Sequence, residues 1–215
     1  MRLILGRHGN TFTPAEKAVW IGARSDLPLV AAGCVQARRL GQVLRDAKVA
    51  LAAIYCGSLQ RTRRHAEIVA QQAGAPLTPI IAPALVEIDY GQWEGLSSEE
   101  ISAKYGSEEL EAWEQHSIWP RSAGWRPSEE VVARRITEFA RSLVADHGED
   151  EVVLAITSNG ILRYALRLAP GAFDAHVQAR NVKVATGHVC VIEGQPCGYH
   201  VVAWNRLPEP ALFER

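Results

Sequence analysis

The chain has 215 residues, 47% hydrophobic and 22% charged, which is ordinary for a globular protein and enough to bury a full core. The formal net charge of −1 excludes a broadly basic surface, so we expect no nucleic-acid partner and only local affinity for anions. The four cysteines and seven histidines show no metal-ligand spacing, so we expect no metal site and no cofactor.

The first predicted element is a buried strand over residues 2–6, which runs into Arg7, His8 and Gly9. This apolar stretch is too short for a signal peptide or a membrane span, so we expect a cytoplasmic protein with no membrane partner. In an open α/β sheet, the carboxyl ends of parallel strands line one crevice where ligands bind. A guanidinium beside an imidazole there, with Gly9 allowing close approach of the backbone, suits an anionic substrate.

A helix, a second strand and a second helix are predicted next. Helical spacing of apolar residues predicts a helix over residues 31–47, and the apolar run 52–56 predicts a strand. Ser58 is the predicted N-cap of the following helix, which Gly74 stops. Arg61 lies one turn into that helix, and we expect its guanidinium to reach the crevice at the strand ends.

Residues 91–128 differ in character, because glutamate clusters, glycines and prolines accompany the tryptophans Trp93, Trp113, Trp119 and Trp125. A long aromatic-rich connection is often a lid or the wall of a substrate site. The alternative is a small pair of helices packed by its tryptophans, and the two interpretations are compatible. We predict one domain over residues 1–215, with an inserted lid-like subregion at about 91–128.

The last third of the chain predicts a helix over about 129–146, a third buried strand over 152–156 and a helix from Ile161. The third strand ends at Thr157-Ser158-Asn159-Gly160, which places a helix N-terminus at the crevice. The free N–H groups of a helix N-terminus attract anions.

Two final strands over residues 188–193 and 199–204, joined by residues 194–198, predict a hairpin. The exposed edge of a terminal hairpin can pair with a second copy across a two-fold axis. A homodimer is therefore an open alternative for the oligomeric state.

Together these strand ends would supply two arginines, a histidine and a helix N-terminus, a set suited to a tetrahedral phosphate dianion. Histidine can attack phosphorus as a nucleophile and split phosphoryl transfer into two steps. The leaving alkoxide then needs a proton from a carboxylic acid near the pocket. Candidates for this acid are Glu87, Asp89 and Glu94.

Several segments resemble, in order through nearly the whole chain, the signatures of the histidine phosphatase superfamily in its phosphoglycerate-mutase-like branch. These segments are Arg7-His8-Gly9-Asn10-Thr11, Asp26-Leu27-Pro28-Leu29 with Gly33 and Gln36, Tyr55 to Glu67, and Leu85-x-Glu87 with Gly91-x-Trp93-Glu94-Gly95. The resemblance implies a three-layer α/β/α sandwich, with a mostly parallel central sheet flanked by helices.

The resemblance also implies roles for individual residues. In such enzymes the histidine of the first motif is phosphorylated during turnover, which here implies His8. The proton donor is implied to be Glu87, rather than Asp89 or Glu94. The flanking arginine and the arginine of the second helix hold the phosphate in this family. The predicted substrate-binding residues are thus Arg7, Asn10, Arg61, Ser158 and Asn159.

One departure from the family pattern bears on the chemistry. Aligning Gly160 and Arg163 with the family's S-H-G-G-x-x-R segment puts Ser158 where the family has a second histidine. A serine donates a neutral hydrogen bond, which is weaker than the contact of a protonated imidazole with the transferring phosphoryl group. Losing such a contact costs about 3 kcal/mol, or about a hundredfold in rate. The alternative for Ser158 is an N-cap with no ligand role.

Two further histidines are candidates for compensation. His65 stands where the family usually has threonine, and it shares a helix face with Arg61, so it could lend charge to the pocket. A position on the helix surface is the alternative for His65. His188, at the start of a late strand, could also approach the site.

The sequence supports three functional hypotheses, of which the first is a phosphatase acting without a metal on a small phosphorylated metabolite. The second is a phosphate-binding or regulatory protein with weak or no turnover, which Ser158 favours. The third is a phosphoglycerate mutase. In each case the expected partner is a small phosphorylated substrate or inorganic phosphate.

Overall fold

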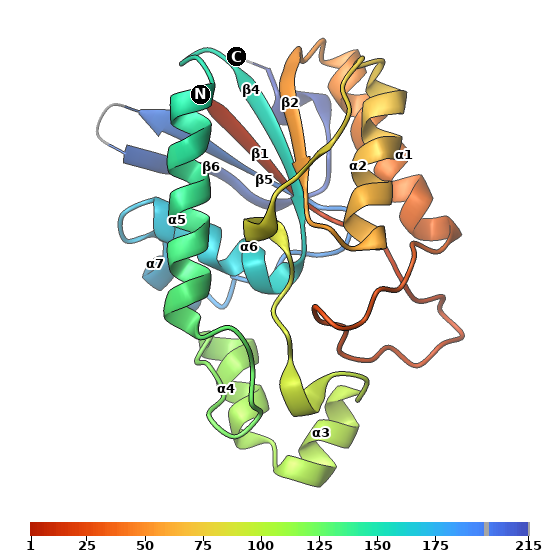
Figure 1. Cartoon of the computed structure of the whole chain (residues 1–215), viewed down its shortest axis with the longest axis vertical. Helices are drawn as coiled ribbons and strands as arrows, with labels where there is room; N and C mark the ends of the chain where they lie inside the picture. The colour runs from red at the N-terminus through yellow and green to blue at the C-terminus, as the bar shows by residue number, and fades with distance from the viewer. Residues whose placement is uncertain (196–197, 215) are drawn as a thin grey trace.

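The computed structural model describes residues 1–195 and 198–214, which form helices around one sheet (Figure 1). Within these residues the sheet has six strands, in the order β3-β2-β4-β1-β5-β6. The strands are β1 (Arg2–Arg7), β2 (Leu51–Cys56), β3 (Ile80–Ile81), β4 (Val152–Thr157), β5 (Val189–Gln195) and β6 (Gly198–Arg206). β1 to β4 run parallel, whereas β5 and β6 each run antiparallel to a neighbour. The predicted, mostly parallel sheet is confirmed.

Helices cover both faces of this sheet (Figure 1). The helices are α1 (Ala31–Asp46), α2 (Gln60–Ala73), α3 (Ser98–Tyr105), α4 (Glu108–His116), α5 (Glu129–Asp146), α6 (Asn159–Ala165) and α7 (Ala172–Gln178), with short 3-10 helices at Pro83–Leu85, Gly91–Trp93, Leu166–Leu168 and Pro210–Leu212. Alternate side chains of β1 serve two cores: Leu3 and Leu5 pack with α5 and α6, whereas Ile4 packs with α1 and α2. The predicted three-layer sandwich is therefore confirmed.

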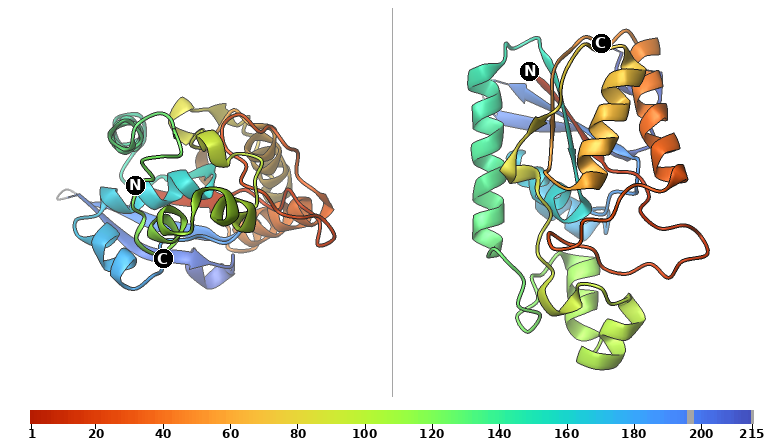
Figure 2. Two further views of the ribbon diagram at one scale, coloured as in Figure 1. Left: turned by 90° about the horizontal axis from the view of Figure 1, so that it is seen from below. Right: turned by 45° about the vertical axis from the view of Figure 1, so that its right-hand side comes forward.

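The segment between β3 and α5 contains the helix pair α3 and α4, which lies beyond the carboxyl ends of the parallel strands (Figures 1 and 2). The ring centroid of Trp125 lies 5.2, 4.8 and 5.1 Å from those of Trp93, Trp113 and Trp119. Trp20, from the loop after β1, joins this cluster at 5.3 Å from Trp93. The predicted pair of helices packed by tryptophans is thus present, whereas its role as a lid stays a prediction.

Some predicted boundaries differ from the structure. The predicted N-cap of α2 is wrong: Leu59 holds the cap position, and the Asp26 carboxylate accepts the Gln60 N–H at 2.6 Å in place of Ser58. α6 begins at Asn159, two residues earlier than predicted. β5 and β6 extend into the predicted hairpin link, of which residues 196–197 lie outside the described residues. In the described parts of the chain, no helix is long and apolar enough to cross a membrane.

Candidate active site

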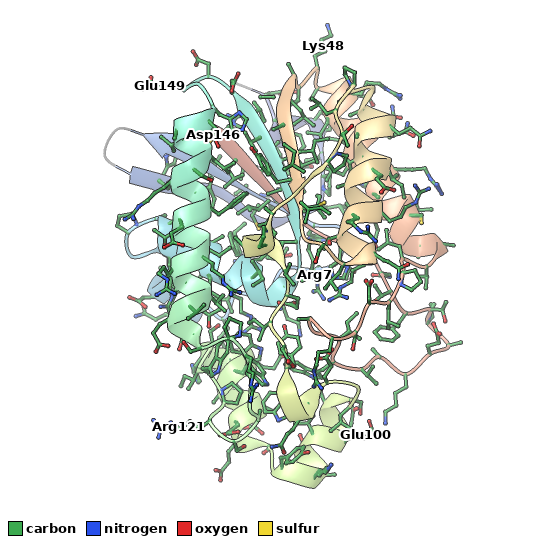
Figure 3. All side chains as sticks on the ribbon, viewed as in Figure 1. Arg7, Lys48, Glu100, Arg121, Asp146 and Glu149 are labelled. Carbon is green, nitrogen blue, oxygen red and sulfur yellow. The ribbon has the colours of Figure 1, made fainter. Side chains whose placement is uncertain are left out.

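A cleft of about 580 Å³ opens where β1 and β4 end, between the sheet and α4. Five of the predicted site residues line it, namely Arg7, His8, Asn10, Glu87 and Asn159. Figure 3 shows Arg7 at the lower end of the sheet, above the inserted helices. The other two predicted residues, Arg61 and Ser158, are buried, with 0% and 1% of their surface exposed. The crevice expected at the strand ends is therefore present. It brings together the residues that follow the first and third predicted strands, which are β1 and β4.

His8 follows β1 directly and is 4% exposed. Its backbone N–H donates to the Thr157 carbonyl at 3.0 Å, which fixes it beside the end of β4. The ring Nδ1 lies 2.8 Å from the Gly9 carbonyl oxygen, so Nδ1 carries the proton and Nε2 keeps its lone pair. Burial, and then the charges of Arg61 and Arg7, hold the pKa of His8 well below its usual value. The ring is therefore neutral and has the tautomer of a nucleophile.

The backbone of Gly9 links His8 to His65. Its N–H donates to His65 Nδ1 at 3.0 Å, while its carbonyl accepts the proton of His8. A Cβ on Gly9 would lie 2.4 Å from the Gly33 carbonyl oxygen, so this close approach requires glycine. His65 is fully buried, and burial lowers its pKa to about 3, which leaves the ring uncharged. Both interpretations of His65 from the sequence, a surface histidine and a source of charge, are therefore wrong.

The guanidinium groups of half-buried Arg7 and buried Arg61 lie close enough to His8 to lower its pKa. Arg7 Nη1 donates to the Val184 carbonyl at 2.5 Å. Arg61 donates to two backbone carbonyls of the 22–25 loop, at 2.5 and 3.0 Å. The Nε of each arginine is buried and has no hydrogen-bond partner in the described part of the chain. Because an unpartnered buried donor is costly, this arrangement favours an anionic ligand as the acceptor.

Glu87 faces the cleft and is 6% exposed. Its Oε1 accepts the Ile88 N–H at 3.0 Å, and its Oε2 accepts the Gly160 N–H at 3.1 Å. The Tyr90 hydroxyl also bonds to this carboxylate, and burial together with the charge of Glu87 keeps the pKa of Tyr90 well above its usual value. A Cβ on Gly160 would lie 2.5 Å from Glu87 Oε1, so glycine allows α6 to begin against the carboxylate.

The two other carboxylates of this segment are engaged outside the cleft. Asp89 Oδ1 accepts from Arg24 Nε and from the Gly91 N–H, both at 2.9 Å. Glu94 Oε1 accepts the Ser25 hydroxyl at 2.6 Å. Of the three candidates, Glu87 is therefore the carboxylate that faces the cleft. Among the described residues, no group of three or more His, Cys, Asp or Glu side chains could hold a metal ion.

The predicted asparagines hold one edge of the cleft. Asn10 Oδ1 accepts the Thr186 hydroxyl, and Asn159 Oδ1 accepts the Val184 N–H at 2.9 Å. Since Arg7 also donates to Val184, the 184–186 segment is fastened to the ends of β1 and β4. Both asparagines therefore shape the end of the cleft that contains His8.

Ser158 holds the N-cap position of α6, but its Oγ makes no capping hydrogen bond and has no partner among the residues that the structure describes, so its role as a ligand stays a prediction. The prediction for His188 is wrong. The Nδ1 of His188 lies 3.2 Å from the Asn205 carbonyl oxygen, and His188 does not line the cleft. His188 therefore does not approach the site.

The cleft is also lined by residues that the sequence did not single out. Phe12 and Trp20 supply aromatic surface beside Trp113 of the predicted wall, and Lys183 Nζ forms an ion pair with Glu114 Oε2 at 3.0 Å. The two charged residues are 69 positions apart, and neither belongs to a motif. Only the tryptophan-rich composition of the inserted segment indicated a wall here.

Comparisons with known proteins extend over most of the chain. Residues 3–207 match the model of the histidine phosphatase superfamily (branch 1). A 2,3-bisphosphoglycerate-dependent phosphoglycerate mutase of Azorhizobium caulinodans is 30% identical over 188 residues, which cover 79% of this chain and 88% of that protein. The structure of YhfR from Bacillus stearothermophilus is 28% identical, with a TM-score of 0.76 and 99% of each chain covered. A native mycobacterial glucosyl-3-phosphoglycerate phosphatase shares the fold at 23% identity, with a TM-score of 0.77 over 95% of this chain and 98% of that chain.

Proposed function

Since the chain belongs to the histidine phosphatase superfamily (branch 1), we propose that it hydrolyses a small phosphomonoester through a phosphohistidine on His8. The observation that carries this proposal is the state of the His8 ring, which is buried, neutral and protonated at Nδ1. Its Nε2 lone pair is free, and two guanidinium groups with unpartnered N–H groups lie nearby. A neutral nucleophile next to fixed positive charge suits attack on a phosphate ester.

The side chains of the cleft account for both steps of the reaction without a metal. In the first step, His8 Nε2 attacks phosphorus, the N–P bond forms and the ester P–O bond breaks. Glu87, which takes up a proton together with the bound ester, gives that proton to the leaving oxygen. In the second step, water attacks the phosphohistidine while the Glu87 carboxylate takes its proton, which releases phosphate and restores the His8 lone pair. Arg7 and Arg61 stabilise the phosphoryl oxygens throughout.

Ser158, in place of the family's second histidine, is expected to lower the turnover rate. Its unpartnered hydroxyl would donate a neutral hydrogen bond to the phosphoryl group, where the family pattern has a histidine. A phosphate-binding protein with weak turnover is the second candidate, and this serine favours it. A mutase is the third candidate, which the name of the Azorhizobium relative favours.

The first test is hydrolysis of p-nitrophenyl phosphate, with acid-quench trapping of the phosphoenzyme. Removing the nucleophile in His8→Ala should lower kcat by about a thousandfold or more and abolish trapping. Restoring the family histidine in Ser158→His should raise kcat by about tenfold to a hundredfold. His200→Ala, at a half-buried position on β6 outside the cleft, is the matched control and should behave as wild type. Turnover that survives in His8→Ala would contradict the mechanism, and wild type with neither turnover nor a phosphoenzyme would favour the binding protein.

A further inference from the structure

We propose that the cleft selects phosphomonoesters whose leaving group carries no charge, and that Glu114 is the residue that excludes a second anionic group. This inference rests on the proposed phosphatase function and narrows its substrate class. The leaving group must lie in the outer cleft, because the inner end is formed by Arg7, His8 and Glu87.

The cleft offers few cations to a substrate. Among the described residues that line it, the cations are Arg7, which is adjacent to His8, and Lys183. Lys183 is already neutralised by Glu114 at 3.0 Å. A substrate with a carboxylate or a second phosphate on its leaving group would therefore find its second cation occupied.

Carboxylates add repulsion to this shortage of positive charge. Glu114 and Glu16 both line the cleft. Two hydrogen bonds from Thr13 lower the pKa of Glu16, so its carboxylate is ionised at neutral pH. Burial lowers the pKa values of Arg7 and Arg163, and the negative charge of Glu114 partly offsets this shift, so Glu114 lies within electrostatic range of both guanidinium groups. A second anion on the substrate would thus lie close to a like charge.

The remaining outer surface suits uncharged carbon groups. Trp113 is almost fully buried and forms part of the wall. Trp20 packs edge-on against Tyr90, with ring centroids 5.1 Å apart, and both rings line the same cleft. Aromatic faces bind apolar or ring-shaped leaving groups, and the side chains of Thr11, Thr13 and Ser98 in the same lining are polar but uncharged. The geometry therefore favours a neutral leaving group with an apolar face.

A matched pair of substrates tests this selection. Glycerol 3-phosphate and 3-phosphoglycerate share their carbon skeleton and phosphate position, and differ by a hydroxymethyl group against a carboxylate. Wild type should show a kcat/KM for glycerol 3-phosphate about thirtyfold or more above that for 3-phosphoglycerate, and phenyl phosphate should be better than either. Equal values for the glycerol pair would overturn the inference.

Variants of Glu114 and Lys183 distinguish electrostatic selection of the substrate from a purely structural role of their ion pair in positioning α4. Glu114→Gln should lower the discrimination about tenfold, chiefly through KM for 3-phosphoglycerate, because Lys183 becomes free. Lys183→Gln should raise the discrimination, because Glu114 loses its counter-ion. Glu111→Gln, exposed on the same helix, is the control and should leave the ratio unchanged. Equal loss on both substrates in both variants would show a bracing role and contradict the inference.

Failure of the proposed function would be visible separately. His8-dependent hydrolysis of p-nitrophenyl phosphate establishes that function before the pair is compared. If wild type does not turn over, calorimetric Kd values for the same two ligands give the same comparison. Tighter binding of glycerol 3-phosphate than of 3-phosphoglycerate, with a smaller ratio of the two Kd values in Glu114→Gln, supports the inference. Tighter binding of 3-phosphoglycerate overturns it.

Discussion

The lone pair of His8 depends on one residue, Gly9, whose backbone N–H and carbonyl groups are both hydrogen-bonded. The Gly9 carbonyl takes the ring proton of His8, and the Gly9 N–H is anchored on His65. The sequence showed His8 and Gly9 as a motif, but it did not show that a histidine four positions after Arg61 would be buried. The reason is that the sequence of a helix does not show which segment will pack against each of its faces. Here α2 packs against the loop that follows β1.

Two replacements of His65 should distinguish its role as a hydrogen-bond acceptor from the packing of its imidazole ring. His65→Leu leaves the buried Gly9 N–H unpartnered, which should cost about 1–3 kcal/mol of stability and lower kcat more than it raises KM. His65→Asn keeps an oxygen acceptor within reach and should recover most of the loss. Urea unfolding and p-nitrophenyl phosphate kinetics check both variants. Equal behaviour of the two would show that the Gly9 hydrogen bond does not position His8.

At the scale of elements, hydrophobic periodicity located most helices and strands. The apolar stripe of residues 129–146 gave both ends of α5, because Ser128 precedes it and β4 follows after a short turn. The start of α2 was missed because its cap comes from Asp26, which is 34 positions earlier in the chain. Arg61 donates to the carbonyls of Gly22 and Ser25, which lie shortly before Asp26 in the chain. Residues 22–26 and the start of α2 are therefore held together. Long-range caps of this kind leave no local sequence signal.

The cap of α2 can be tested with a pair of variants. Asp26→Ala should lower the free energy of unfolding by about 0.5–2 kcal/mol, because the Gln60 N–H loses its carboxylate acceptor. Ser58→Ala removes the residue that local sequence rules favour, and should change stability by less than about 0.5 kcal/mol. Thermal or urea unfolding distinguishes them. A larger effect from Ser58→Ala would restore the local cap.

For the whole molecule, the family motifs specified the sandwich and the phosphate end of the cleft, while the outer wall was predicted only in kind. Trp20 comes from a loop that no motif covers, and the Lys183–Glu114 pair joins two segments distant in sequence. Such contacts form only when the fold brings the segments together. The cytoplasmic location, the homodimer and the small-molecule partner stay predictions.

Two buried neutral histidines make the fold sensitive to acid. The pKa of His8 is well below 6.5 and that of His65 is about 3, because burial disfavours their charged forms. Unfolded histidine takes up a proton below about pH 6.5, so the unfolded state binds more protons there and stability falls as the pH falls. Each histidine contributes up to about 1.4 kcal/mol per pH unit between its two pKa values. His65→Asn should flatten the dependence of unfolding free energy on pH between about pH 6 and about pH 4, and an unchanged slope would contradict this account.

The position of β1 has a consequence for how such a chain can change. β1 is hydrogen-bonded to β4 on one side and to β5 on the other, so its amide hydrogens exchange with solvent only when the whole protein unfolds. Residues 11–19 have no regular structure and are largely exposed, so they exchange through local opening. The end of the cleft that contains His8 therefore depends on the global stability of the fold, whereas the wall over residues 11–19 does not. Under the proposed function, substitutions in that wall would alter the accepted leaving group without moving His8, so substrate preference could diverge while the chemistry stays the same.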